Sequence, residues 1–446
     1  MLVLVTALWV TEALPYFVTA LLIPALVVWM DILEEPHSHG VSMGRSEAAQ
    51  LVLGGMVNHT TVLIMGGYSI SAAFSRCEIE LRIASVLQQT LGHHPRLFIL
   101  SIMYLGLFLS MLISNHTAPV LCVSVLLPIV RDFSVDSRFA KALLLGLAFA
   151  CNFGGMVTPI SSMQNVVAAQ ALEENGYVLG FGVWITVALP FCLFGVFMAW
   201  VIVVLVMDPS DIDKIPVIVY TKPRVLTRRN VFVLGMTMAA IAAWSTIGQS
   251  VDFWGDLGII SIALIVVLFG SGILSEVDFN SFAWHTLFLL GGGNVLGLAI
   301  RSSHLLNFIA HSVVDVLPQD NPWLLVAEVC SVTLFISTFV SHTVAAIVLM
   351  PIIVKVGVKC GIPVILAFSA ALAVSSGCAL PFSSFPNITS LLVTDDFNRL
   401  YLKVPDFVKC GIPMSLATIG MICTLGYFLV DAILLPAIGY LPSDDD

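Results

Sequence analysis

Two short polar sequences lie inside long apolar stretches and carry groups that could bind a small ion. The first is Asn115-His116-Thr117 and the second, a little over two hundred residues later, is Ser341-His342-Thr343. Amide, hydroxyl and imidazole groups can donate hydrogen bonds to an oxyanion. Neither sequence contains Asp or Glu, so an anion would meet no fixed negative charge there. The two sequences could therefore converge on one small anion.

A second motif follows each of these polar sequences. Residues 154–165 and residues 376–387 match at a Pro, at a Ser-Ser pair and at a final Asn. The same motif found twice in one chain, after the same kind of polar sequence, indicates an internal repeat. Proteins with two such halves in a membrane commonly hold their substrate between inverted repeats, at broken helices. The sequence therefore predicts two inverted repeats with a shared site.

The same motifs suit a cation as well as an anion. Broken helices leave carbonyl groups unpaired, and these can form a neutral cage for Na⁺ together with Ser, Thr and Asn oxygens. Two copies indicate two such cages, and the absence of carboxylates favours sodium coupling over a proton relay. Proton coupling stays open, since the reference pKa of an imidazole lies close to neutral pH, which keeps His116 and His342 as candidates, and Glu328 lies in an apolar segment.

The elements that must position these residues are membrane helices. Hydrophobic residues make up 59% of the 446 residues, charged residues make up 10%, and the mean hydropathy is +1.02. With roughly 20 apolar residues per crossing, the chain has room for about ten to thirteen membrane segments. Several apolar stretches contain Pro or Gly near the middle, and hydrocarbon tolerates broken helices only where protein or ions satisfy the backbone. We predict an all-α, multi-pass membrane protein with re-entrant hairpins.

The repeats and the polar stretches divide the chain into ordered parts. Five Lys and Arg residues lie between Asp208 and Asn230, which predicts that this linker is cytoplasmic. The predicted parts are residues 1–50 (first membrane helix and outer loop), 51–207 (repeat 1 with its hairpin and broken helix), 208–230 (linker), 231–280 (connecting membrane helices), 281–440 (repeat 2 with its hairpin and broken helix) and 441–446 (acidic tail).

Over nearly its whole length the chain resembles the divalent anion:sodium symporter family, whose members carry dicarboxylates, sulfate or phosphate. The matching features are residues 7–15 (ALWVTEALP), residues 18–24 (VTALLIP), the glycine pairs that begin each half and the two sets of motifs. His116 and His342 stand where the family usually has Asn. This exchange resembles the branch of fungal-type low-affinity phosphate transporters, which usually carry an N-terminal SPX domain. This chain starts directly at a membrane helix, which suggests a truncated or incomplete protein.

The resemblance implies roles for residues and for the whole assembly. It implies that Ser161 and Ser383 offer carbonyls to sodium, and that Ser162 and Ser384 offer hydroxyls to the anion. Three of the four prolines of the family's closing motifs are absent here, which leaves the backbone geometry of these tips open. It further implies a homodimer in which each protomer has a scaffold and an elevator-type transport domain.

Together these observations predict a site for two kinds of ion. The predicted substrate-binding residues are Asn115, His116, Thr117, Ser162, Ser341, His342, Thr343 and Ser384. The predicted sodium-binding residues are Ser114, Asn115, Ser161, Asn165, Ser341, Ser383 and Asn387. No other metal, no cofactor and no nucleic-acid partner is expected.

The leading hypothesis is sodium-coupled transport of inorganic phosphate in the plasma or vacuolar membrane. Sulfate or dicarboxylate symport and proton-coupled phosphate transport remain alternatives. The sequence gives little support to two other hypotheses, an anion channel and a phosphotransferase that uses His116 or His342 as its nucleophile. No catalytic carboxylate or metal motif accompanies the histidines, and a channel would not need two cation cages. We therefore expect a transporter and not an enzyme.

Overall fold

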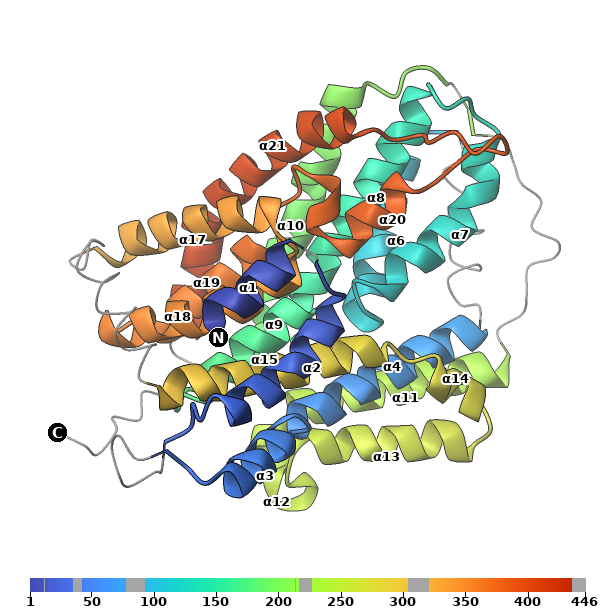
Figure 1. The fold of residues 1–446 in the computed structure, drawn as a ribbon. Coiled ribbons are helices and arrows are strands. Elements are labelled where there is room, and N and C mark those ends of the chain that lie inside the picture. The colour runs from blue at the N-terminus through green and yellow to red at the C-terminus, as the bar shows by residue number, and fades with distance from the viewer. Residues whose placement is uncertain are drawn as a thin grey trace.

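The chain folds into helices joined by short connections. A computed structural model describes residues 1–11, 13–34, 42–77, 93–212, 214–215, 227–303 and 321–434. The predicted acidic tail and most of the predicted cytoplasmic linker lie outside the described residues. The described helices form two groups, one above the other in Figure 1.

We call the lower group the framework unit. Its helices are α2 (Tyr16–Trp29), α3 (Arg45–Gly55), α4 (His59–Cys77), α11 (Arg228–Ser245), α12 (Ile247–Trp254), α13 (Leu257–Gly270), α14 (Glu276–Asn280) and α15 (Trp284–Ser302). Within it α4 packs against α13, and α15 packs against α2. Glycines allow both contacts, because a Cβ on Gly66 would lie 2.7 Å from the Ser261 Cβ and a Cβ on Gly292 would lie 2.4 Å from the Ala20 carbonyl oxygen.

We call the upper group the hairpin unit. Its helices are α6 (Pro95–Leu112), α7 (Thr117–Arg131), α8 (Arg138–Val157), α9 (Met163–Glu173), α10 (Phe181–Met207), α17 (Pro322–Phe339), α18 (His342–Lys359), α19 (Pro363–Val374), α20 (Phe385–Leu391) and α21 (Val404–Met421). A short 3₁₀ turn, η1 (Pro381–Ser383), precedes α20, and α21 continues through η2 (Ile422–Gly426), α22 (Tyr427–Leu429) and η3 (Val430–Leu434). Helix α1 (Leu2–Val10) contacts α2 and α18.

The hairpin unit contains the same arrangement twice. Helices α6 to α9 correspond in order to α17 to α20, and both sets begin with a proline in the first helical turn, Pro95 and Pro322. Each set has two breaks, one at the first polar sequence and one at the closing motif. The two sets also exchange contacts, since α9 packs against α18 and α7 packs against α20. The prediction of two repeats with broken helices is confirmed, whereas the predicted range boundaries stay predictions.

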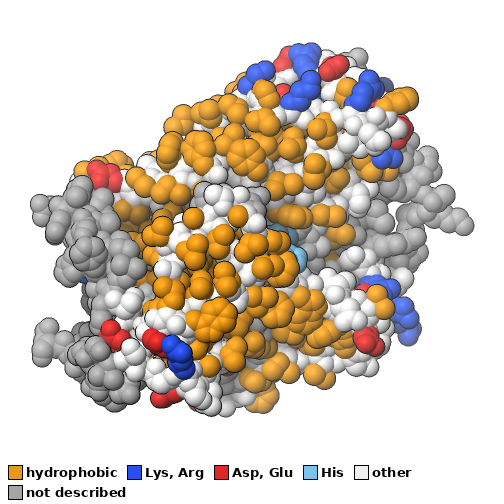
Figure 2. Space-filling model, in the orientation of Figure 1, with side chains coloured by type: hydrophobic (Ala, Val, Ile, Leu, Met, Phe, Trp, Pro, Cys, Tyr) orange, Lys and Arg blue, Asp and Glu red, His pale blue; other side chains and the backbone are white. Residues whose placement is uncertain are grey.

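The surface is that of a membrane protein. Seven helical stretches among the described residues are long and apolar enough to cross a bilayer, and shorter apolar helices such as α7, α13 and α19 accompany them. Figure 2 shows an apolar surface over the middle of the visible face, with Lys and Arg mainly near one end. Large apolar side chains such as Leu205 and Phe335 are exposed to the surroundings. The chain is therefore an integral, multi-pass membrane protein, as predicted.

An ion pair closes one end of the framework unit. The Arg76 Nε at the end of α4 lies 2.7 Å from the Asp278 Oδ1 in α14, which lies outside the membrane-spanning helices. The Arg76 guanidinium, helped by bonds from Ser275, lowers the pKa of Asp278 to about 2. The carboxylate therefore stays ionised at neutral pH, and its contribution to stability is lost only as the pH falls from about 4 towards 2.

Candidate functional site

The first polar sequence forms the tip between α6 and α7. The backbone N–H of Asn115 donates to the Ser161 carbonyl oxygen over 2.9 Å, so this tip contacts the closing motif of its own repeat. The Ser114 hydroxyl accepts from the backbone N–H of His116, the N-cap residue of α7, at 3.0 Å. The Asn115 side chain is buried against Gly155, where a Cβ would lie 2.7 Å from the Asn115 Cβ. Asn115 therefore has a fixed position in the first break.

The closing motif of repeat 1 holds its break with two side chains. The Ser161 hydroxyl lies 2.8 Å from the Gly155 carbonyl oxygen and 2.9 Å from the Thr158 carbonyl oxygen. The Asn165 Nδ2 donates to the same two oxygens, over 2.8 Å in each case. We call Gly155, Thr158, Ser161 and Asn165 the first cluster. These contacts give partners to carbonyl groups that the broken helix α8–α9 leaves without intrahelical ones.

The closing motif of repeat 2 repeats this geometry at the same intervals along the chain. The Ser383 hydroxyl lies 2.6 Å from the Gly377 carbonyl oxygen and 2.8 Å from the Leu380 carbonyl oxygen. The Asn387 Nδ2 donates to the Leu380 carbonyl oxygen over 3.2 Å. We call Gly377, Leu380, Ser383 and Asn387 the second cluster. The duplication read from the sequence therefore extends to individual hydrogen bonds.

The second polar sequence forms the tip between α17 and α18. Ser341 occupies the N-cap position of α18, and the buried His342 and Thr343 are its first two residues. The His342 Nε2 lies 3.2 Å from the Gly377 carbonyl oxygen of the second cluster. Because a carbonyl oxygen only accepts, this nitrogen must carry the proton. His342 thus ties its tip to the closing motif of the same repeat.

Side chains also join the two repeats to each other. The Asn152 Nδ2 in α8 donates to the Asn387 Oδ1 of the second cluster over 3.0 Å. The His116 ring at the first tip lies against the Phe385 ring at the start of α20, with centroids 5.1 Å apart. Each contact joins one predicted residue, Asn387 or His116, to a residue of the other repeat that was not predicted.

Several buried oxygens of the first break have no hydrogen-bond partner among the described residues. They are the Asn115 Oδ1, the Asn165 Oδ1, the Ser162 Oγ and the Gln164 Oε1. Burying a polar atom without a partner costs about 1–3 kcal/mol, so such atoms at one place indicate a ligand. All four carry lone pairs and none belongs to a charged group, which fits a monovalent cation such as Na⁺ or, for the Ser162 hydroxyl, a contact to an anion.

The backbone adds positive potential at the same place. Helices α7, α9 and α18 begin at the breaks, with His116, Ser162 and Ser341 at their N-cap positions. Free N–H groups at helix starts favour anions. The breaks can therefore offer acceptor oxygens to a cation and backbone donors to an anion within the same region.

Sequence reasoning missed Asn152 and placed one candidate far from the breaks. Asn152 is the one amide side chain in α8, a helix that is otherwise largely apolar, so its isolation in the sequence was a usable signal.

Glu328, the candidate for proton coupling, lies in α17 eleven residues before the end of that helix, or about 16 Å along it. It is exposed at the edge of an apolar groove between α17 and α18. The described structure therefore does not bring Glu328 to the tips.

Comparison with known proteins gives relatives over the whole chain. The inorganic phosphate transporter PHO87 of Saccharomyces cerevisiae is 35% identical over 432 residues, covering 96% of this chain and 46% of that protein. The low-affinity phosphate transporter PHO90 of the same yeast is 35% identical over 434 residues, covering 96% and 48%. This chain thus spans about half the length of these relatives. The sodium-dependent dicarboxylate transporter SdcS of Staphylococcus saprophyticus is 23% identical over 463 residues, covering 96% and 84%.

A solved structure and a family model complete the comparison. The structure of MtrF from Neisseria gonorrhoeae, whose title describes antimetabolite efflux pumps, superposes with a TM-score of 0.55 at 12% identity and covers 94% of this chain and 95% of that one. This likeness shows the fold. The model of the sodium:sulfate symporter transmembrane region matches residues 1–434, which confirms the resemblance seen in the sequence. The chain belongs to the sodium:sulfate symporter family of membrane transporters.

Proposed function

We propose that this protein transports inorganic phosphate across a membrane, coupled to sodium. The observation that carries the proposal is the pair of carboxylate-free clusters. Three of the four hydrogen bonds of the first cluster recur in the second, and Asn152 and Asn387 join the two repeats. The similarity to PHO87 and PHO90 supports phosphate, and the similarity to a sodium-dependent transporter supports the coupling ion.

In this proposal each repeat holds sodium with neutral oxygens. In repeat 1 they come from Ser114, Asn115, Ser161 and Asn165, of which the Asn115 and Asn165 side-chain oxygens are buried and unpaired among the described residues. In repeat 2 they come from Ser341, Ser383 and Asn387. Bound sodium adds positive charge beside the anion, so the affinity for phosphate rises with the sodium concentration.

The phosphate oxygens accept hydrogen bonds from side chains at the tips and at the closing motifs. These are Asn115, His116, Thr117, Ser162, Ser341, His342, Thr343 and Ser384. His116 contacts Phe385 of the other repeat, so an anion beside it can meet groups of both repeats. The neutral His116 imidazole can donate to a phosphate oxygen without a fixed charge, whereas His342, whose Nε2–H faces the Gly377 carbonyl oxygen, can donate from Nδ1 only when its ring is protonated.

Alternating access would follow from motion of the hairpin unit against the framework unit. Small residues of the framework face the hairpin unit at two places, since a Cβ on Gly67 would lie 3.7 Å from the Ile160 Cδ1 and a Cβ on Gly293 would lie 3.3 Å from the Ile347 Cγ2. Smooth surfaces of this kind suit a rigid-body, elevator-like displacement.

We further propose that the protein is a homodimer and that it lies in the plasma membrane or the vacuolar membrane.

The test is uptake of radiolabelled phosphate into proteoliposomes with an inward sodium gradient, an inward proton gradient or none. The proposal expects stimulation by sodium alone and no stimulation when choline replaces sodium. Stimulation only by protons would assign coupling to a titrating group such as His116 or His342. Absence of uptake by protein that elutes as a folded species would overturn phosphate as the substrate.

The second candidate is a sulfate or dicarboxylate symporter. It is favoured by the family match and by SdcS, and the neutral donors of the site suit any small divalent oxyanion. Competition separates the candidates. Excess unlabelled phosphate should suppress labelled phosphate uptake far more than equal sulfate or succinate does, and the reverse order would favour the second candidate.

Replacing Ser384 with alanine is expected to raise the KM for phosphate at least about tenfold, because a hydrogen bond to a charged group contributes about 1.5–3 kcal/mol. The hydroxyl is buried at the N-cap of α20. The matched control is Ser124→Ala in α7, whose exposed hydroxyl donates to the Leu121 carbonyl oxygen. Equal KM values for the two variants would remove Ser384 from the anion site.

A further inference from the structure

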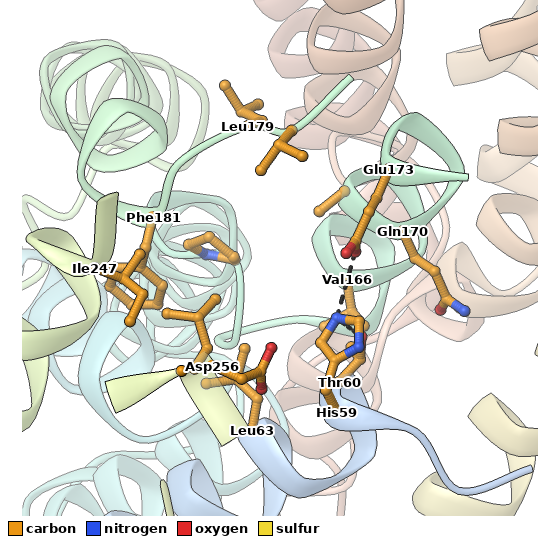
Figure 3. Close-up of a pocket in the computed structure, with 15 residues that line it drawn as sticks. His59, Thr60, Leu63, Val166, Gln170, Glu173, Leu179, Phe181, Ile247 and Asp256 are labelled. Carbon is orange, nitrogen blue, oxygen red and sulfur yellow. Dashed lines mark hydrogen bonds and ion pairs between the residues drawn. The ribbon is translucent and has the colours of Figure 1, made fainter. Parts of the chain in front are cut away.

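An ion pair joins the two units away from the clusters. His59 in the first turn of α4, in the framework unit, places its Nε2 3.3 Å from the Glu173 Oε2 at the end of α9, in the hairpin unit. Figure 3 shows the two side chains meeting at one wall of a cavity. The pairs Arg76–Asp278 and Arg138–Asp208, by contrast, each lie within one unit.

The cavity beside this pair has walls from both units. Its volume is about 350 Å³, and its lining includes Leu63 and Asp256 of the framework and Val166 and Phe181 of the hairpin unit. Such a cavity shows that the units are not tightly packed here, since protein interiors leave few voids larger than a water molecule. A relative displacement of the units at this place would separate His59 from Glu173, and it would also part apolar contacts such as that between the Phe181 and Trp244 rings, whose centroids are 5.5 Å apart.

The groups that face the His59 ring from each neighbouring element are few. Glu173 faces it from α9, and Asp256 contributes a more distant negative charge from the start of α13, where its Oδ1 accepts from the Gly258 N–H over 2.6 Å. The Thr60 hydroxyl lies 3.2 Å from the same Nε2. Glu174, the next residue of the chain, lines a separate small cavity with Asn294. Two carboxylates therefore lie around His59, one within ion-pair distance and one farther away.

The helix that carries Glu173 also carries part of the first cluster. Helix α9 begins directly after Ser162, includes Asn165 in its first turn and ends at Glu173. Its length is about 16 Å, and its apolar residues Met163 and Val166 pack on Ile64 of the framework unit. A rigid helix of this length transmits a restraint at Glu173 directly to the break.

We propose that His59 and Glu173 are a pH-dependent positioning pair, which holds the hairpin unit against the framework unit when His59 is protonated. At a pH below the pKa of His59 the two side chains form an ion pair, and at a pH above it they form a weaker contact with a neutral imidazole. The hairpin unit therefore moves away from the framework unit more slowly as the pH falls. Helix α10 runs about 40 Å from Phe181 beside this cavity to the predicted cytoplasmic linker, so the pair responds to pH on the side away from that linker.

The first measurement is the initial rate of sodium-driven phosphate uptake, from about pH 5.5 to about pH 8. Each variant is expressed as a ratio to the wild type at the same pH, so the titration of phosphate itself cancels. For His59→Gln the ratio is expected to be about two to five at the acid end and close to one at the alkaline end, because a half-exposed pair contributes up to about a factor of five. In His59→Arg the side chain stays positively charged at every pH. The ion pair with Glu173 therefore persists at alkaline pH, where the wild type has lost it, and the ratio falls below one there.

Matched variants separate the pair from general effects. His93→Gln replaces an exposed histidine before α6 and should give a ratio near one at every pH. Glu173→Gln should reproduce His59→Gln, and the double variant should resemble either single variant because both remove the same interaction. A flat ratio for His59→Gln, or full additivity in the double variant, would overturn the proposal.

A second measurement needs no transported substrate. Hydrogen–deuterium exchange of α9 and of the first turns of α4, with labelling times corrected for the intrinsic pH dependence, reports how firmly the two units are joined. Both segments should exchange faster in His59→Gln than in the wild type at acid pH and equally at alkaline pH. Equal exchange at both pH values would overturn the proposal even if phosphate proves not to be the substrate.

Discussion

Replacing Asn387 with alanine is expected to lower the rate of sodium-driven phosphate uptake by about a hundredfold. Asn387 is fully buried, and its side chain accepts from Asn152 of the other repeat and donates to the Leu380 carbonyl oxygen. Truncation leaves the Asn152 Nδ2 with only a weak contact to the Cys378 Sγ at 3.7 Å, and it takes from the Leu380 carbonyl oxygen one of its two bonds, the other coming from Ser383. A buried polar group that loses its partner costs about 1–3 kcal/mol. A change of about 1.4 kcal/mol alters a rate or an affinity tenfold. The break before α20 therefore loses its defined shape.

The control for this prediction is Asn175→Ala. The Asn175 Nδ2 also donates to a backbone carbonyl oxygen, that of Ala171, but in a half-buried turn after α9. It should leave uptake within about twofold of the wild type. Thermal melting of both purified variants shows whether loss of activity follows loss of folding. A folded Asn387→Ala protein with near-normal uptake would mean that the contact between the repeats does not matter for transport.

The repeat and the broken helices could be predicted because their signals are local in the sequence. Short polar stretches such as Asn115-His116-Thr117, set inside apolar segments, have few explanations other than a break, and hydrocarbon permits breaks only under strict conditions. The two polar sequences and the two closing motifs together located four breaks without any structure. The cluster members Ser161, Asn165, Ser383 and Asn387 follow from the same pattern and lie together in the described structure.

Contacts that join distant parts of the chain were not predictable in this way. Nothing near Asn152 indicates that its partner is Asn387, and nothing near His59 indicates that its partner is Glu173, because both contacts depend on how separate helices pack. The sequence predicts that His342 contacts substrate, but it does not reveal that the His342 Nε2 lies against the Gly377 carbonyl oxygen. Only the other ring nitrogen is then left for an ion, a constraint that spacing in the sequence cannot express.

The second prediction with a large effect concerns Gly155, which makes room for Asn115. A Cβ built on Gly155 would lie 2.7 Å from the Asn115 Cβ and 3.1 Å from its Nδ2, closer than real contacts allow. Gly155→Ala should therefore displace the Asn115 side chain, whose buried oxygen is one of the proposed sodium ligands. We expect the sodium concentration for half-maximal uptake to rise at least about tenfold and the rate to fall about thirtyfold, from a cost of about 2 kcal/mol.

The form of this loss distinguishes a damaged sodium site from general misfolding. Gly235→Ala is the matched control, because Gly235 also lies within a helix, α11, and an added Cβ there meets nothing within 4 Å. It should leave uptake and stability unchanged or slightly improved. If Gly155→Ala loses its dependence on sodium while its thermal stability remains close to that of Gly235→Ala, the first break is a sodium site. If instead the rate falls while half-maximal uptake still needs the same sodium concentration, Asn115 contributes to the anion or to the fold, and sodium must be bound elsewhere.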